Sequence, residues 1–267
     1  MTNIIALTDL CNWNLKSGSH EWPGPNGGTC INEAAIVAAG FEYKSVSTAS
    51  DCPPCFSPVV SAYLIQLNDH LNDVDRQQLI RFVTRLSGSR DTDAVEQKRL
   101  EFIVIETVRR IVSIAMDAAE LPACATECRA VRTLAEALAA AANAAGAASV
   151  AANEAYRAQR AHIALRAANA AGVAAHAAIM ADEAIDTATL LAAGRIPAYI
   201  ADQAADAANI ASNIAANAST MTKKAITHHC IQIVEGALAI GNQATDIDAA
   251  LVVTRMAQSR TQAMAST

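Results

Sequence analysis

Apolar residues recur with a helical period through the first half of this chain, and the pattern predicts several helices there. The longest is predicted for residues 91–121. Its apolar stripe comprises Leu100, Ile103, Val104, Val108, Ile111, Val112 and Ala115. Residues three and four apart share one face of an α-helix, so this stripe indicates a buried face. Shorter helices are predicted for residues 30–40, 58–71 and 74–86, the first with Thr29 as its N-cap.

The pattern changes after Pro122, because alanine replaces the larger apolar residues from Ala123 to Ala218. Alanines recur at alternating steps of four and three residues, and the series includes Ala144, Ala148, Ala151, Ala155 and Ala158. This is the spacing of a coiled-coil seam, and small side chains allow two helix backbones to approach closely. Each buried methyl group contributes only about 0.8 kcal/mol, so such helices need length or a partner to be stable.

The chain shows no convincing strand pattern, which predicts an all-α fold. We expect a small Cys/His-rich N-terminal module on a helical core within residues 1–121. The alanine-rich region, residues 122–267, is expected to form long helices packed as hairpins or a bundle. Further helices are predicted near residues 199–219, 223–240 and 245–258.

Composition narrows the classes of function. The net charge is −6 with a pI of about 5.5, and this acidity disfavours binding to nucleic acid, which needs clustered Lys and Arg. The longest uncharged run is mostly alanine with several Asn, so we expect no membrane span. The N-terminus lacks a basic start and a long apolar segment. We therefore expect no secretory signal and a cytoplasmic protein, where close cysteine pairs more often bind metal or do chemistry than form disulfides.

A His and three Cys near the start of the chain predict a metal site. His20, Cys30, Cys52 and Cys55 supply the four ligands that a structural zinc ion takes, and Cys52 and Cys55 have the two-residue gap of a zinc knuckle. The loop-rich residues 1–57 contain little apolar mass, so a zinc ion would supply folding energy there. Glu33 follows Cys30 by one helical turn, where it would orient a ligating His or cap the helix.

Three other interpretations of these residues stay open. The cysteines are equally well explained as small buried thiols. A redox dithiol has the right gap but lacks the βαβ context of thioredoxins. An enzyme is the third interpretation, with Cys30 as nucleophile or Glu33 as base for a metal-bound water. In the nucleophile case His20 or His70 would be the base, and Asn68 or Asp69 would orient it.

The first half of the chain also resembles a family of bacterial proteins, many from actinobacteria and their phages, with alanine-rich helical tails. The resemblance covers roughly residues 14–120. Its motifs are Gly18-Ser-His20, Cys30-x-x-Glu33-Ala34, Ala38-Ala39-Gly40, Asp51-Cys52-Pro53-x-Cys55, Pro58-Val59, Asn68-Asp69 and Arg85-Leu-x-Gly88. The family usually has His where this chain has Cys52, and some members have Cys where it has Ser57. Because both His and Cys bind zinc, the exchange favours a metal ligand at position 52. The resemblance carries no assigned activity.

Together these patterns predict a non-enzymatic helical protein for interaction or self-assembly. The N-terminal module would be stabilised by zinc, and the alanine-rich helices would bind a second copy of the chain or another protein.

Overall fold

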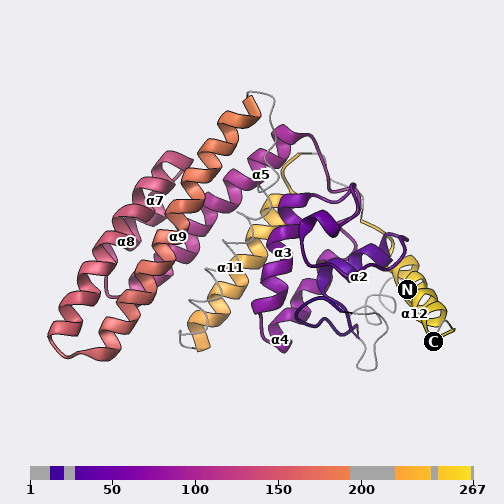
Figure 1. The fold of residues 1–267 in the computed structure, drawn as a ribbon, viewed down its shortest axis with the longest axis horizontal. Coiled ribbons are helices and arrows are strands. Elements are labelled where there is room, and N and C mark those ends of the chain that lie inside the picture. The colour runs from indigo at the N-terminus through magenta and orange to yellow at the C-terminus, as the bar shows by residue number, and fades with distance from the viewer. Residues whose placement is uncertain (1–12, 21–27, 193–219, 242–245, 266–267) are drawn as a thin grey trace.

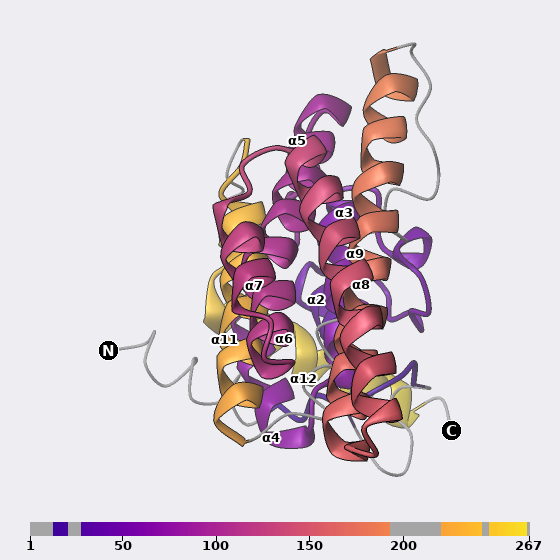
Figure 2. The same ribbon diagram turned by 90° about the vertical axis from the view of Figure 1, so that its left-hand side faces the viewer.

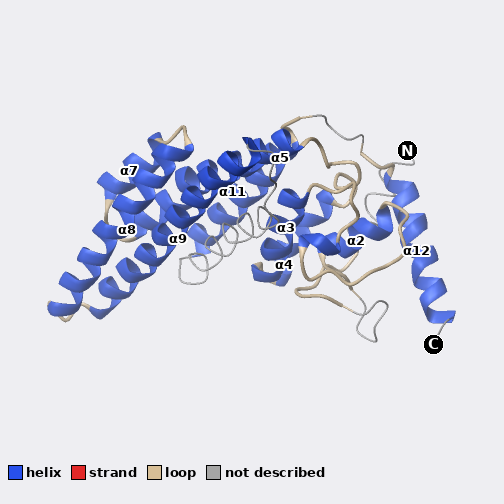
Figure 3. Cartoon of the chain, turned by 45° about the horizontal axis from the view of Figure 1, so that its top comes forward, coloured by secondary structure: helices blue, strands red, loops and turns tan. Residues whose placement is uncertain are grey.

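The structure, a computed structural model, describes residues 13–20, 28–192, 220–241 and 246–265. These residues are mostly helical and include no strand, as Figure 3 shows, so the all-α prediction is confirmed. An isolated parallel bridge joins Leu15 to Thr29. The helix predicted for residues 199–219 lies outside the described ranges.

The helices follow one another as α2 (Ile31–Ala38), α3 (Pro58–His70), α4 (Asp73–Arg76), α5 (Asp93–Glu106), α6 (Ser113–Ala118), α7 (Pro122–Ala130), α8 (Leu134–Arg157), α9 (Ala161–Ala192), α11 (Thr220–Leu238) and α12 (Ala249–Ala265). Short 3-10 helices cover Ala49–Asp51 (η1) and Gln77–Phe82 (η2), and a π-helical segment covers Thr107–Val112 (η3). The single helix predicted for residues 74–86 is therefore divided between α4 and η2.

The core is built from large apolar side chains of α2, α3, η2 and α5. Tyr63, Phe82, Leu100 and Ile103 are among its largest fully buried members. In the C-terminal part, α11 packs against α5 and α3, and α12 packs against α2 (Figure 1). Gly236 of α11 permits this close approach, because a Cβ there would lie 2.3 Å from the ring of Phe102. The chain thus returns to its first half after the alanine-rich helices.

The long helix predicted for residues 91–121 is interrupted once. The π-helical segment η3 lies between α5 and α6, and it contacts α7, α9 and α11. The helix ends at Ala118, where Glu120 adopts a left-handed backbone with φ of 63°. The N–H of Leu121 then donates to the carbonyl of Met116, which completes a Schellman cap. The periodicity located the buried face but did not reveal the wider turn.

The alanine-rich helices α8 and α9 form an antiparallel hairpin, and Figure 2 shows the two helices running side by side. Thr133 and Glu136 form a capping box at the start of α8. At the hairpin turn Gln159 has a φ of 56°, and the N–H of Arg160 donates to the carbonyl of Ala155. Of the predicted alanine seam, Ala144, Ala148 and Ala155 are buried, Ala151 is half-buried and Ala158 is exposed at the helix end. The spacing therefore identified the packed face of α8.

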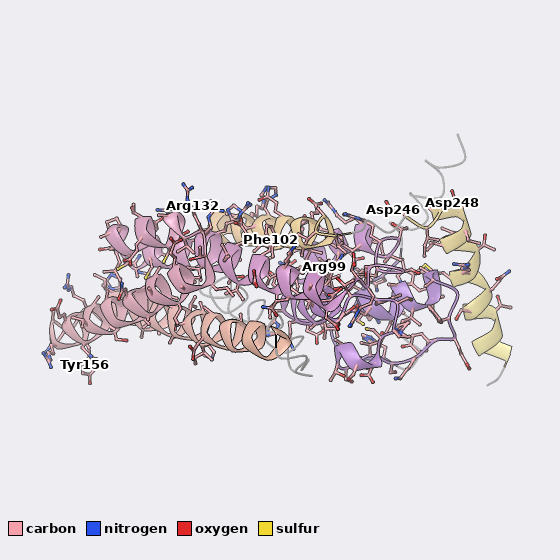
Figure 4. The ribbon with its side chains drawn as sticks, turned by 90° about the horizontal axis from the view of Figure 1, so that it is seen from above. Arg99, Phe102, Arg132, Tyr156, Asp246 and Asp248 are labelled. Carbon is pink, nitrogen blue, oxygen red and sulfur yellow. The ribbon has the colours of Figure 1, made fainter. Side chains whose placement is uncertain are left out.

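A buried ion pair fastens α5 to the end of α11. Arg99, labelled in Figure 4, is fully buried, and its Nη1 lies 2.7 Å from Oε1 of Glu96. Its Nε donates to the carbonyl of Ala237 at 3.1 Å, and its Nη2 donates to that of Ile240 at 2.9 Å. Glu96 also accepts a hydrogen bond of 2.5 Å from the Ser57 hydroxyl. Because every charged atom here has a partner, the pair fixes three segments together.

Candidate functional site

Glu33 organises the N-terminal region, where the sequence placed the candidate chemistry. It is the third residue of α2, and its backbone N–H donates to the Sγ of Cys30 at 3.4 Å. Its carboxylate in turn accepts the N–H of Cys30 at 2.8 Å. These two bonds form a capping box, so the N-cap is Cys30 and the prediction of Thr29 as N-cap is wrong by one residue. The hydroxyl of Thr29 instead accepts a hydrogen bond from the indole of Trp13.

The Glu33 carboxylate is fully buried and joins three segments of chain. Oε1 accepts the N–H of His20 at 3.0 Å and the N–H of Val46 at 3.1 Å. Oε2 accepts the N–H of Cys30 and lies 3.4 Å from Nδ1 of the His20 ring. Burying a carboxylate is costly unless hydrogen bonds compensate, and the three N–H groups supply that compensation. Glu33 is thus the residue on which the loops around α2 converge.

His20 is held by its backbone and is partly open to solvent. Its carbonyl accepts hydrogen bonds from the hydroxyls of Tyr43 and Ser45. Its side chain is 22% exposed and pairs with Glu33 through Nδ1. A carboxylate on one ring nitrogen is the arrangement that orients a His towards a metal or substrate at the other nitrogen. The structure therefore places the Glu33 carboxylate beside the His20 ring, and a metal at the other ring nitrogen stays a prediction of the sequence.

Asn68 and Asp69, at the end of α3, hold the preceding loop. Oδ1 of Asn68 accepts the N–H of Ile31 at 3.2 Å, and its Nδ2 donates to the carbonyl of Lys16 at 2.8 Å. Oδ1 of Asp69 accepts the N–H of Gly18 at 2.7 Å. Asn68 therefore helps to cap the neighbouring helix α2.

The cysteines of this region are free thiols in two different settings. Cys30 is buried, and burial followed by the nearby Glu33 carboxylate raises the pKa of its thiol. Cys52 is half-buried, and burial raises its pKa to about 11 although the Ser61 hydroxyl acts in the opposite direction. Cys55 is half-buried, and its carbonyl accepts the N–H of Arg90 at 2.9 Å. The thiols of Cys30 and Cys52 therefore stay protonated at neutral pH.

The four predicted zinc ligands do not form one cluster in the structure. In the described ranges no group of three or more His, Cys, Asp or Glu side chains is placed to hold a metal ion. Cys30 faces the core as a helix cap, and His20 faces Glu33. Zinc at His20, Cys30, Cys52 and Cys55 stays a prediction of the sequence.

A second candidate surface lies on the α8–α9 hairpin, and sequence patterning did not single it out. Large apolar side chains that are exposed in the described part of the chain are Phe41, Val74, Val150, Tyr156, Leu165, Ile179 and Leu251. Four of them lie on the hairpin, with exposed fractions of 58% for Val150, 77% for Tyr156, 61% for Leu165 and 55% for Ile179. Figure 4 shows Tyr156 at the far tip of the hairpin. The signal in the sequence was the few large residues among many alanines.

One helix of the hairpin is also long and apolar enough to cross a membrane by length and composition. This helix is α8, and 28% of its most apolar window is buried inside the protein. One such helix is weak support for a membrane span, since helices of soluble proteins meet the same criterion. It nevertheless leaves a large uncharged surface uncovered, because residues 137–153 carry no charge.

Comparison of the chain with protein-family models, with curated proteins and with solved structures gave no match.

Proposed function

We propose that this is a non-enzymatic helical protein for interaction or self-assembly, with the α8–α9 hairpin as its binding arm. The observation that carries the proposal is the gathering of exposed Val150, Tyr156, Leu165 and Ile179 on two helices with few charges. Apolar surface that gathers on one element is a common mark of a protein–protein contact. The helices α2, α3, α5, α11 and α12, with the segments between α2 and α5, form the base of the molecule.

The shape of the molecule supports a binding role for the arm and a supporting role for the base. The hairpin tip lies at one end of the elongated molecule and α12 at the other (Figure 3). Within the hairpin the buried residues are mainly alanines, so the two helices stabilise each other weakly per residue. A partner that covers the outer faces would add the apolar burial that the arm lacks.

The enzyme interpretation gains no support from the geometry of Cys30. A nucleophilic cysteine needs a lowered pKa and access to substrate. The Cys30 thiol is buried and serves as a helix cap, and its pKa is raised by burial and by Glu33. Its environment is therefore that of an unreactive structural thiol.

A structural zinc ion in the N-terminal module is a separate part of the proposal, supported by the residue types and by the His20–Glu33 pair. Elemental mass spectrometry of protein purified without a metal-affinity column tests it. About one zinc per chain, lost in Cys55→Ser, would establish the site. A metal-free protein with an intact fold would assign the cysteines to packing and leave the arm as the functional element.

Light scattering on the full-length chain tests the interaction proposal. We expect the molar mass to rise above the 27.8 kDa of one chain as concentration increases, or a stable complex with one other protein. A parallel flotation assay with neutral and anionic vesicles separates self-association from membrane binding. A protein that stays at 27.8 kDa throughout, and that binds the vesicles, would overturn the proposal in favour of a membrane-active hairpin.

A further inference from the structure

We infer that the tip of the hairpin arm docks on helix α4 of a second copy of this chain, and that the two copies form this contact reciprocally. The inference rests on the proposed function and names the partner of the arm. It is carried by the two most exposed large apolar side chains in the described part of the chain, Val74 and Tyr156, and by the opposite charges that flank them.

The arm tip, residues 156–162, is a continuous exposed segment that joins α8 to α9. Tyr156 begins it and lies at the far end of the hairpin in Figure 4. Arg157 and Arg160 follow, and neither forms an ion pair with any residue that the structure describes. Glu154 precedes the segment, but no ion pair joins it to Arg157. Tyrosine and arginine are the residue types that most often carry protein–protein contacts, so the tip has the composition of a binding surface.

The charge of the arm tip contrasts with that of the rest of the protein. The whole chain has a net charge of −6, whereas the tip carries two arginines and no acidic residue. Lys, Arg, Asp and Glu are absent from residues 137–153 of α8 and from residues 167–181 of α9. The cationic surface of the arm is therefore confined to the neighbourhood of its tip. A partner that presents carboxylates beside an apolar side chain would complement it.

Helix α4 presents such a surface in the base. Val74 is 80% exposed and lies between Asp73 and Asp75 in the sequence, and we call these three residues the α4 patch. Asp73 pairs with the buried Arg76. Asp75 accepts hydrogen bonds from side-chain amides and has no cationic partner among the described residues. The patch is thus an exposed apolar side chain with a carboxylate on each side and an excess of negative charge.

The arm tip and the α4 patch are complementary in polarity and in charge. When they dock, Tyr156 covers the partner's Val74, and the two arginines of the tip approach the carboxylates that flank it. Aromatic cover over an aliphatic side chain supplies apolar burial, and opposite charges at its rim set the orientation. An exposed tyrosine beside unpaired arginines is thereby matched by a surface of the same protein.

The two surfaces of one chain are separate, so the contact forms between copies. The helices of the arm and α4 make no extensive contact, and Figures 1 and 2 show the tip and α4 apart. Both lie at the lower edge of the molecule in Figure 1. A two-fold axis between them brings each tip to the partner's α4, and the dimer is then closed by two identical contacts.

Salt separates this contact from association through the alanine faces of the arm. Ion pairs at an exposed rim weaken as the Debye length falls from about 10 Å at 0.1 M salt to about 3 Å at 1 M. Burial of apolar surface does not weaken in this way. We therefore expect the dimer Kd, measured by sedimentation equilibrium, to rise with salt concentration. A Kd that stays constant or falls would contradict a tip held by charge.

Charge reversal of the tip is the first mutational test. Arg157→Glu/Arg160→Glu is expected to raise the dimer Kd by roughly tenfold or more, because it places like charges together. Arg132→Glu/Lys224→Glu is the matched control, since it changes the net charge equally at exposed positions outside the arm. Both double variants should keep the circular dichroism spectrum and melting temperature of the wild type. Equal effects of the two double variants on the Kd, or none, would overturn the inference.

Mixing two variants tests the pairing of surfaces directly. Asp73→Lys/Asp75→Lys reverses the α4 patch, and this variant alone should also associate poorly. In a mixture with the tip-reversed chain, however, the reversed tip meets the reversed patch and the native tip meets the native patch. We expect native mass spectrometry to show a heterodimer with an affinity close to that of the wild type. Folded variants that form no heterodimer would refute the pairing.

Val74→Lys tests the patch without touching an ion pair, because Val74 is exposed and nonpolar. It should weaken the wild-type dimer, and it should be tolerated by the tip-reversed chain. A wild-type dimer that is insensitive to every tip and patch variant overturns this inference alone, and so does a monomer that binds another protein. A chain that is monomeric throughout and binds no partner overturns the proposed function as well.

Discussion

The base and the hairpin arm are stabilised in different ways. The base buries large side chains such as Tyr63, Phe82 and Leu100, and it also buries Ser57, Glu96 and Arg99, which hydrogen-bond to one another. The arm buries mainly alanine, and no polar residue of α8 or α9 with a described side chain is buried. Large side chains and satisfied polar networks specify one arrangement, whereas alanine seams fit several neighbours. The comparison explains why a partner surface is expected on the arm.

The largest expected effect breaks the polar network of the base. Arg99→Leu leaves Glu96 buried without its cationic partner and frees the carbonyls of Ala237 and Ile240. We expect a loss of about 3–5 kcal/mol in the free energy of unfolding, measured by urea denaturation. Arg90→Leu, which breaks the exposed pair with Asp93, is the control and should cost less than about 1 kcal/mol. Similar losses of stability in Arg99→Leu and Arg90→Leu would show that the buried ion pair contributes no more than an exposed one.

A second prediction removes the carboxylate that gathers the loops around α2. Glu33→Ala leaves the N–H groups of His20, Cys30 and Val46 without an acceptor, and we expect a loss of about 3 kcal/mol in urea denaturation. Alkylation of Cys30 by iodoacetamide should become faster as the helix cap opens. Glu42→Ala, at an exposed position nearby, is the control. An unchanged Cys30 alkylation rate in Glu33→Ala would refute the role of the carboxylate.

Ionisation of cysteines at alkaline pH should destabilise the base and not the arm, because α8 and α9 contain no cysteine. Burial raises the pKa of Cys230 to about 12, and it also raises the pKa of Cys30. Both thiols stay neutral in the folded protein while those of the unfolded chain ionise near pH 8.5, so stability is full below that pH and falls above it. We expect a loss of about 1.4 kcal/mol per thiol for each pH unit from about 9 towards 12. Cys230→Ala should make the free energy of unfolding, measured by urea denaturation at several pH values, less dependent on pH.

The smallest effects are expected in the arm. Ala148→Gly removes one buried methyl and weakens the helix, for an expected loss of about 1.5 kcal/mol. Gly146→Ala at an open position should instead stabilise the protein by about 0.8 kcal/mol. Urea denaturation followed by helical circular dichroism measures both. A loss above about 3 kcal/mol in Ala148→Gly would mean that the arm is as specifically packed as the base.

The sequence predicted the elements whose signals are local. Apolar periodicity located α2, α3 and the buried face of α5, and alanine spacing located the packed face of α8. The division of residues 74–86 between α4 and η2, and the π-helical turn η3, were not predicted, because they depend on packing against distant helices.

The candidate site was predicted only in part, for the same reason. The position of Glu33 one turn after Cys30 predicts that it orients a ligating His or caps the helix, but spacing did not reveal that Cys30 is the N-cap. Nor did it reveal the partners of Arg99, which lie about 140 residues away in the chain. Local spacing pairs Cys52 with Cys55, but it cannot report whether distant residues such as His20 and Cys30 converge on that pair.

Hydrogen–deuterium exchange of the full-length protein at low and high concentration tests the central claim most directly. We expect the amides of α8 and α9 to become more protected as concentration rises, while those of α2 and α5 in the base stay constant. That result would identify the arm as the surface that a second copy covers. Exchange in α9 that is independent of concentration, in a protein shown to associate over the same range, would contradict the account.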